Sequence, residues 1–321
     1  MMYGCPYQGS KNFIAERIVQ VLPPSEVFVD LFAGGCAITH AAMMSGKWER
    51  FIANDFGHMP DVFYNAVNGY ASDTKRWFRW VSRERFFEER KKPYIQRDPA
   101  LMSIWSFGNN CKEYIYGKTI EPWKHALWKA RVEGDFSWLA DFGVVTNDAS
   151  LQWMRDHLEE NNKKYVAWLD RHGIMKRDSS DRQMYCLQSL EALQRLQRLQ
   201  RLQIKCGDYR LVDIPDDATV YCDPPYEATC SKAYQGEKFN HAAFWEWCRT
   251  INFPVFVSEY HAPDDFTVWR KIDTVSRMCD KLTKKSHEYV FVHKRFANSL
   301  LVKMIQNKTL IKQSGNSCQT V

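Results

Sequence analysis

Residues 219–226, Thr-Val-Tyr-Cys-Asp-Pro-Pro-Tyr, constrain the fold of this chain more than any other stretch. The first four are mostly β-branched or aromatic and predict a short buried strand. Asp223 ends that strand, and the two prolines after it lack an N–H and keep the backbone extended. The result is a stiff turn with a carboxylate and bare carbonyl groups at the carboxyl end of a strand, where open α/β sheets bind their ligands.

Such a turn suits the transfer of a group to an exocyclic amine such as N6 of adenine. The lone pair of this amine is delocalised into the ring, and acceptors for its two hydrogens would localise it and stabilise the charge that develops on attack. We predict that Asp223 and Pro224 supply these acceptors, that Tyr226 stacks on the base, and that Cys222 is a bystander. The alternative is an ordinary strand end, because Asp and Pro are common in tight turns.

A glycine turn earlier in the chain follows a similar hydrophobic strand. Residues 27–31 predict the strand, residues 32–35 (Phe-Ala-Gly-Gly) the turn and residues 37–44 a helix, which together form the first unit of a doubly wound sheet. A second strand at residues 51–53 ends in Asn54-Asp55. Asp55 lies 20 residues after Gly35 (55 − 35), the usual interval to an acid that binds ribose hydroxyls. The pattern predicts a cofactor that contains a nucleoside.

The rest of the chain continues the α/β pattern. Residues 7–11 (Tyr-Gln-Gly-Ser-Lys) form a small-residue loop that opens a helix and could hold an anion or a carboxylate. Residues 202–206 predict a strand, after which Asp208 could meet the adenine of the cofactor. Asn240 is expected to cap a helix at residues 242–250. Strands are predicted at residues 255–258, 274–278 and 289–293, the last two as an antiparallel edge pair.

Composition narrows the class of protein. The 321 residues carry a net charge of +6, which permits a polyanionic partner without demonstrating one. The ten cysteines form no Cys-x-x-Cys pair, so we expect reduced thiols, no metal site and a cytoplasmic protein. No apolar run approaches the roughly 18 residues needed to span a membrane.

The middle of the chain, residues 61–199, changes to helical periodicity and is predicted to be a helical inserted domain. Residues 75–92 combine eight basic with three acidic residues among two Trp and three Phe, a mixture that suits phosphate contact and base stacking. Arg76, Arg79 and Arg83 are the predicted contacts, although the segment could equally be a helix with a solvated charged face. Asn109 and Asn110 lie in an amide-rich loop that could read base edges or be an ordinary turn.

Four motifs, in this order, resemble those of the Dam-like adenine-N6 DNA methyltransferases. They are Tyr7-x-Gly-Ser-Lys11, Asp30-Leu-Phe-Ala-Gly-Gly35, Asn54-Asp55 and Asp223-Pro-Pro-Tyr226. The resemblance covers roughly residues 5–60 and 200–295. It implies a Rossmann-like catalytic domain at residues 1–60 and 200–300, recognition of the DNA target by the inserted residues 61–199, S-adenosylmethionine as methyl donor and flipping of the target base out of double-stranded DNA. Residues 307–321 are polar and predicted to be a tail. The cofactor contacts it implies are Tyr7, Lys11, Asp55 and Asp223. Asp30, Phe32 and Gly34 at the glycine turn, and Asp208, are further candidate contacts to the cofactor.

Two positions depart from the motifs of this family. Tyr7 stands where Trp is frequent, and Cys36 stands where a second spaced glycine is usual, which bears on how tight the turn is. Two other functions remain open at this stage: a DNA-binding protein on a decayed methyltransferase scaffold, and a cytosine-N4 methyltransferase, which more often has Ser in place of Asp223. We expect a monomer or a weak dimer, encoded by a bacterium or a phage as the resemblance implies.

Overall fold

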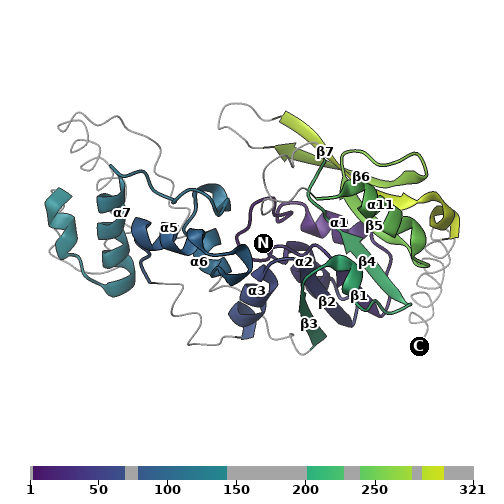
Figure 1. The fold of residues 1–321 in the computed structure, drawn as a ribbon, viewed down its shortest axis with the longest axis horizontal. Helices are drawn as coiled ribbons and strands as arrows, with labels where there is room; N and C mark the ends of the chain where they lie inside the picture. Colours follow the sequence, from purple (N-terminus) through teal and green to yellow (C-terminus); the bar gives the residue numbers. More distant parts are fainter. Residues whose placement is uncertain (1–2, 69–78, 143–200, 228–238, 277–283, 300–321) are drawn as a thin grey trace, which may run out of the picture. The chain divides into compact units, whose positions relative to one another are not determined.

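The computed structural model describes residues 3–68, 79–142, 201–227, 239–276 and 284–299. The chain divides into two compact units, which are described separately (Figure 1). The first comprises Met1–Cys5, Gly9–Asn68 and Leu193–Val321, and the second Pro6–Gln8 and Gly69–Ala192. The described residues do not include Arg76, the predicted tail at residues 307–321 or the end of the strand predicted at 274–278.

A seven-stranded sheet of order β3-β2-β1-β4-β5-β7-β6 forms the first unit. The first five strands in this order are parallel, while β7 is antiparallel to both β5 and β6. This mixed α/β sheet is Rossmann-like, as the sequence predicts. The strands are β1 (Val27–Asp30), β2 (Arg50–Asp55), β3 (Leu202–Cys206), β4 (Ala218–Cys222), β5 (Val255–Glu259), β6 (Phe266–Ser276) and β7 (Lys284–His293).

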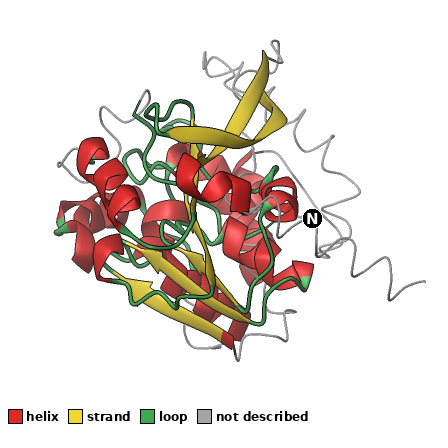
Figure 2. Cartoon of the chain, turned by 90° about the vertical axis from the view of Figure 1, so that its right-hand side faces the viewer, coloured by secondary structure: helices red, strands yellow, loops and turns green. Residues whose placement is uncertain are grey.

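Helices cover both faces of the sheet because successive side chains of a strand point to opposite sides (Figure 2). Val27 and Val29 of β1 belong to a core cluster that includes Phe244 of α11. Asp30 points the other way, and its carboxylate accepts a hydrogen bond from Thr39 of α2. The helices of this unit are α1 (Ala15–Val21), α2 (Ala37–Ser45), α3 (Met59–Asn68) and α11 (His241–Thr250).

Local signals account for where these helices begin and end. The side chain of Asn240 accepts a hydrogen bond from the N–H of Ala243, which confirms the predicted cap of α11. Helix α1 buries Ile18 and Val19 and ends before Pro23 and Pro24, which cannot continue it. Helix α3 contacts β2 and β3 and belongs to the first unit.

Strands β6 and β7 extend past the rest of the sheet as a two-stranded ribbon (Figure 2). They are antiparallel and lie at the sheet edge, as predicted, but the prediction that the first begins at residue 274 is wrong. β6 begins at Phe266, because the alternation of apolar residues before Thr274 is also satisfied by pairing with β7. β7 lies between β5 and β6. It therefore pairs with the parallel part of the sheet, and β6 is the edge strand.

The second unit is helical in its described part. Its elements are α5 (Arg83–Lys91), η1 (Tyr94–Gln96), α6 (Pro99–Ile104), η2 (Phe107–Asn109), α7 (Glu121–Trp128), η3 (Lys129–Glu133) and η4 (Ser137–Phe142). Trp123 and Leu127 of α7 pack with Leu139 and Phe142 of η4 in one core. The ring of Trp80 lies 4.3 Å from that of His125 and 5.0 Å from that of Trp105, which adds an aromatic cluster. No helix in the described ranges is long and apolar enough to cross a membrane.

Candidate active site

Three buried or partly buried acids follow the carboxyl ends of neighbouring parallel strands. Asp30 ends β1, Asp55 ends β2 and Asp223 follows β4, while β1 pairs with both of the other strands. Asp30 is 1% and Asp55 5% exposed. The sheet order therefore brings together three residues that the sequence places at separate strand ends, because parallel strands present their carboxyl ends at one edge.

The glycine turn after β1 is tied to the end of β2. The N–H of Gly34 donates to Oδ2 of Asp55 at 2.9 Å, and the N–H of Gly57 donates to Oδ1 of the same carboxylate at 2.9 Å. Burial raises the pKa of Asp55, and these two hydrogen bonds oppose that rise. A carboxylate has about four acceptor sites, so Asp55 keeps acceptor capacity for a ligand beyond these two bonds.

Cys36 maintains the turn at the position where the sequence resemblance leads us to expect a glycine. It precedes α2 in the left-handed conformation, with φ of 60°, a region that a residue with a Cβ enters at a cost. Its N–H donates to the carbonyl of Ala33 at 2.6 Å, which closes the turn. The thiol is fully buried, and burial raises its pKa well above the ordinary value, so Cys36 has a structural role.

The two carboxylate oxygens of Asp30 differ in their contacts to the described residues. Oδ2 accepts from the Thr39 hydroxyl at 2.8 Å, whereas Oδ1 is buried without a hydrogen bond to any described residue. Burial raises the pKa of Asp30 to about 7, with further contributions from the charges of Asp223 and Asp55. A buried acceptor of this kind is rare in a finished core and is a place where a ligand donor fits.

A buried ionic cluster surrounds Asp223. The ammonium of Lys11 lies 2.8 Å from Oδ1 of Asp223 and 3.9 Å from Oε1 of Glu288, and these side chains are only 13%, 17% and 8% exposed. Burial raises the pKa of Asp223 and Lys11 opposes this rise. Burial alone would lower the pKa of Lys11, but the two carboxylates outweigh it and raise the pKa. Lys11 is therefore charged, with two carboxylates sharing one ammonium.

Tyr226 is held from three directions. Its hydroxyl donates to Oε1 of Glu288, the Lys11 ammonium lies 4.5 Å from its ring centroid, and the Tyr260 ring packs edge-on at 4.8 Å. The turn itself is fixed by His241, whose Nε2 donates to the carbonyl of Pro225 at 2.6 Å. The N–H of Glu227 donates to Glu259 at 3.3 Å. These contacts hold Tyr226 in one orientation, and Pro224 in the same turn is buried.

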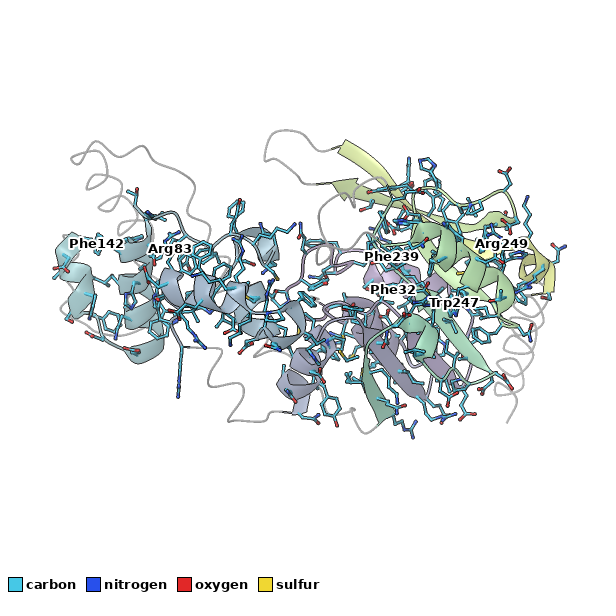
Figure 3. All side chains as sticks on the ribbon, in the orientation of Figure 1. Phe32, Arg83, Phe142, Phe239, Trp247 and Arg249 are labelled. Atoms are coloured by element: carbon cyan, nitrogen blue, oxygen red, sulfur yellow. The ribbon has the colours of Figure 1, made fainter. Side chains whose placement is uncertain are left out.

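Phe32 and Asp208 lie in different surroundings from the acids. The Phe32 ring is 5.1 Å from Tyr209 and 5.7 Å from Phe239, within an aromatic group (Figure 3). Asp208 caps the short helix η6 (Tyr209–Leu211) and forms an ion pair with Arg210. Its carboxylate is therefore already engaged, and Arg210 lowers its pKa.

The remaining predicted site residues belong to the second unit, which includes Tyr7. Arg83 is directed inward: its guanidinium contacts Glu121 at 2.8 Å, donates to the carbonyl of Tyr116 and lies 4.8 Å from the Tyr114 ring. Arg79 is exposed and precedes α5, which begins only after its Ser82 cap. The segment predicted as one basic stretch thus contains arginines in unlike environments.

Asn109 and Asn110 stabilise a turn. Asn109 has a positive φ of 58° and its amide donates to the carbonyl of Ser103 at 3.0 Å. Oδ1 of Asn110 accepts from the N–H groups of Lys112 and Glu113. Their side chains therefore account for the shape of this loop, which is the simpler of the two sequence interpretations.

Sequence reasoning missed Glu288, Tyr260, His241 and the buried Glu259. Glu288 lies in a strand whose sequence offers no turn or motif, so only its burial marks it. Phe56 was also missed, although it directly follows Asp55 and is 55% exposed, a position from which an aromatic ring can contact a ligand. Within the described ranges, no group of three or more His, Cys, Asp or Glu side chains could hold a metal ion.

Comparison with known proteins is consistent with this geometry. Residues 7–115 match the family model described as D12 class N6 adenine-specific DNA methyltransferase. A search against individual curated proteins finds no match. The matched region includes the glycine turn, Lys11 and Asp55, and the family supports adenine N6, rather than cytosine N4, as the methylated atom.

Proposed function

We propose that this chain, whose residues 7–115 match the D12 class of N6 adenine-specific DNA methyltransferases, methylates adenine in DNA. The methyl donor is S-adenosylmethionine, and the acceptor is N6 of an adenine flipped out of duplex DNA. The reaction takes place at the edge of the sheet where Asp30, Asp55 and Asp223 lie. The observation that carries this proposal is the buried Lys11–Asp223 contact in the stiff turn after β4.

The charge of the site fits this cofactor. S-adenosylmethionine supplies an electrophilic methyl group on a positively charged sulfonium, together with an ammonium and a carboxylate. The site contains four carboxyl groups, those of Asp30, Asp55, Asp223 and Glu288, and Lys11 contacts only the last two, so the excess of acid favours a cationic ligand. The unpartnered Oδ1 of Asp30 would accept from an ammonium, and Asp55 has acceptor capacity for ribose hydroxyls.

Other residues complete the proposed cofactor site. Lys11 would approach a carboxylate, the Gly34 turn allows close approach of the backbone, and Phe32 and Phe56 offer apolar surface for the adenine ring. Asp208 is proposed as a contact to the adenine at the cost of its bond to Arg210. Tyr7 stays a proposed contact from the N-terminal loop.

Asp223 and Pro224 would bind the target amine. Lys11 engages Oδ1 of Asp223 and the Tyr226 hydroxyl also contacts this carboxylate, so we assign its remaining acceptor capacity, on Oδ2, to one amino hydrogen, with the carbonyl of Pro224 taking the other. Both acceptors are set in place before the reaction and withdraw the lone pair from the ring. N6 then attacks the methyl carbon, the carbon–sulfur bond breaks with its electron pair retained by sulfur, and one N6 proton leaves to Asp223 or water.

DNA binding is proposed for the second unit. The exposed Arg79 and, from the sequence alone, Arg76 would contact phosphates, which gives affinity without sequence preference. Arg83 would contribute less because Glu121 already neutralises it. Asn109 and Asn110 would act mainly by holding the loop that contains Phe107.

The test is to follow the methyl group. Purified protein is incubated with unmethylated plasmid DNA and S-adenosylmethionine labelled in the methyl group, and the DNA is digested to nucleosides for mass spectrometry. We expect label in N6-methyldeoxyadenosine with the natural chain and a rate of labelling at least about 10²–10³ lower with Asp223→Asn. Label in N4-methyldeoxycytidine would contradict the proposal, as would an Asp223→Asn protein that methylates adenine normally.

A further inference from the structure

Glu288 is a buried carboxylate that contacts the site from a separate strand. It lies in β7, is 6% exposed and faces away from solvent, while its neighbours His287 and Tyr289 are partly exposed. Its oxygen Oε1 accepts from the Tyr226 hydroxyl and lies 3.9 Å from the Lys11 ammonium. The hydroxyl of Ser258 donates to the same carboxylate.

The sheet does not need a carboxylate at this position. The backbone of Glu288 pairs with Ile272 of β6 in the regular register, so an apolar residue would satisfy β7 as well. A buried carboxyl group disfavours folding unless donors compensate it, and here every donor side chain belongs to the site or its support. A costly group whose partners are all functional side chains is a candidate for a role in the reaction.

We propose that Glu288 is a positioning residue for methyl transfer, because it fixes the Tyr226 ring and shares the Lys11 ammonium with Asp223. This inference rests on the function proposed above. Its hydrogen bond sets how the Tyr226 ring faces the target base. Its charge gives the Lys11 ammonium, which contacts Asp223 at 2.8 Å, a second carboxylate partner at 3.9 Å, so that Asp223 is only partly neutralised by this lysine.

Two substitutions separate the hydrogen bond from the charge. Glu288→Gln keeps an oxygen that can accept from Tyr226 but removes the charge. Glu288→Asp keeps the charge but is one methylene shorter, so it cannot reach the Tyr226 hydroxyl. Asp273→Asn is the matched control, because Asp273 is an exposed acid on the adjacent strand that pairs with His287 and touches none of the site residues.

Removing the charge of Glu288 should change how the methylation rate depends on pH. Two carboxylates share one ammonium, so removing the Glu288 charge leaves a simple ion pair and lowers the pKa of Asp223. The acid side of the rate profile, where Asp223 becomes protonated, should therefore move to lower pH in Glu288→Gln. The groups that face Glu288 are Lys11 from the N-terminal loop, Asp223 and Tyr226 from the turn after β4, Ser258 from β5 and, through Ser258, Tyr221 from β4.

The experiment has two measurements. The first is the single-turnover methylation rate at several pH values, and the second is the fluorescence of 2-aminopurine placed in the DNA at the position of the target adenine. We expect Glu288→Asp to lose about 10–100-fold in rate, on the scale of a misplaced reactive group, and to lower the signal of the flipped base. Tyr226→Phe should share this defect, and the double variant should be no worse than either single one. Glu288→Gln should keep the 2-aminopurine signal of the flipped base, while the acid side of its rate profile moves to lower pH.

The outcomes separate this inference from the proposed function. If Asp223→Asn is inactive but both Glu288 variants keep the natural rate and pH profile, Glu288 is structural and the inference is wrong. Fully additive losses in Glu288→Asp/Tyr226→Phe would also contradict it, since they would show independent effects. An active Asp223→Asn protein would instead overturn the proposed function. Circular dichroism and calorimetric S-adenosylmethionine binding confirm that each variant is folded.

Discussion

The backbone N–H of Gly34 donates to Oδ2 of Asp55 across 2.9 Å, so the acid at the end of β2 holds the glycine turn that follows β1. Oδ1 of the same carboxylate accepts from Gly57. One side chain therefore joins two neighbouring strand ends and, in the function proposed here, also binds the cofactor. Substitutions at Asp55 should change both properties together.

Asp55→Ala should weaken the binding of S-adenosylmethionine by about 1–3 kcal/mol, the scale of a lost charge-assisted hydrogen bond. It should also lower the free energy of unfolding by a similar amount, because it leaves two backbone N–H groups without an acceptor. Calorimetry and chemical denaturation measure the two effects. Asp217→Ala, an exposed acid before β4, is the control that should change neither. Unchanged cofactor affinity in folded Asp55→Ala would remove this residue from the cofactor site.

Asp223→Asn should reduce the single-turnover rate by at least about 10²–10³, because one preorganised acceptor is lost. Cys222→Ser, the adjacent substitution, should stay near the natural rate. The Cys222 thiol is fully buried, and burial raises its pKa well above the ordinary value, so no thiolate is present to attack. Rapid-quench methylation assays compare the two variants. A folded but inactive Cys222→Ser protein would contradict a mechanism without a covalent intermediate.

His40 should make the fold sensitive to acid. Its Nδ1 accepts from the N–H of Gly4 at 3.0 Å, and burial lowers its pKa from 6.5 to about 4. Between these values the unfolded chain binds a proton that the folded chain does not, so stability falls as pH drops from 6.5 towards 4, by roughly 3 kcal/mol. His40→Gln keeps an acceptor for Gly4 and should flatten this dependence. Urea denaturation at several pH values measures how the free energy of unfolding depends on pH. If this dependence is unchanged in His40→Gln, His40 is not the cause of the acid sensitivity.

Asp30 should act in the opposite direction. Burial raises its pKa from 3.8 to about 7, so in this range the folded chain binds a proton that the unfolded chain releases. The contribution of Asp30 to the free energy of unfolding is present below pH 3.8 and is lost as pH rises to about 7. Between pH 4 and 6.5 this change offsets the effect of His40. Asp30→Asn should therefore expose the acid sensitivity of His40. In the same urea series, a stability curve for Asp30→Asn that is no steeper than that of the natural chain would contradict this assignment.

The salt dependence of DNA binding should distinguish the two arginines. Arg79→Ala should lower the slope of log K against log salt by about one, because one phosphate contact is lost. Arg83→Ala should leave the slope almost unchanged and lower the free energy of unfolding by about 1–3 kcal/mol, because Glu121 loses its charged partner. Fluorescence anisotropy with labelled duplex DNA measures the slope. Equal slope changes in the two variants would show that Arg83 reaches DNA despite its internal contacts.

The sequence by itself determined the strand ends and therefore the acids of the site. Whether Asp30, Asp55 and Asp223 follow strands depends on short apolar runs and on Gly, Asn and Pro beside them, all of which act over a few residues. The cap of α11 at Asn240 is local in the same way. For the same reason the turn at residues 223–226 is readable from its two prolines alone.

Only the tertiary structure decided which distant side chains meet these acids. Lys11 and Asp223 are 212 residues apart, and Glu288 reaches them because β7 inserts between β5 and β6 rather than following chain order. The inward direction of Arg83 likewise depends on Glu121, which comes from another helix. Contacts of this kind arise from strand order and packing across the whole chain, and a local pattern of apolar and polar residues carries no information about them.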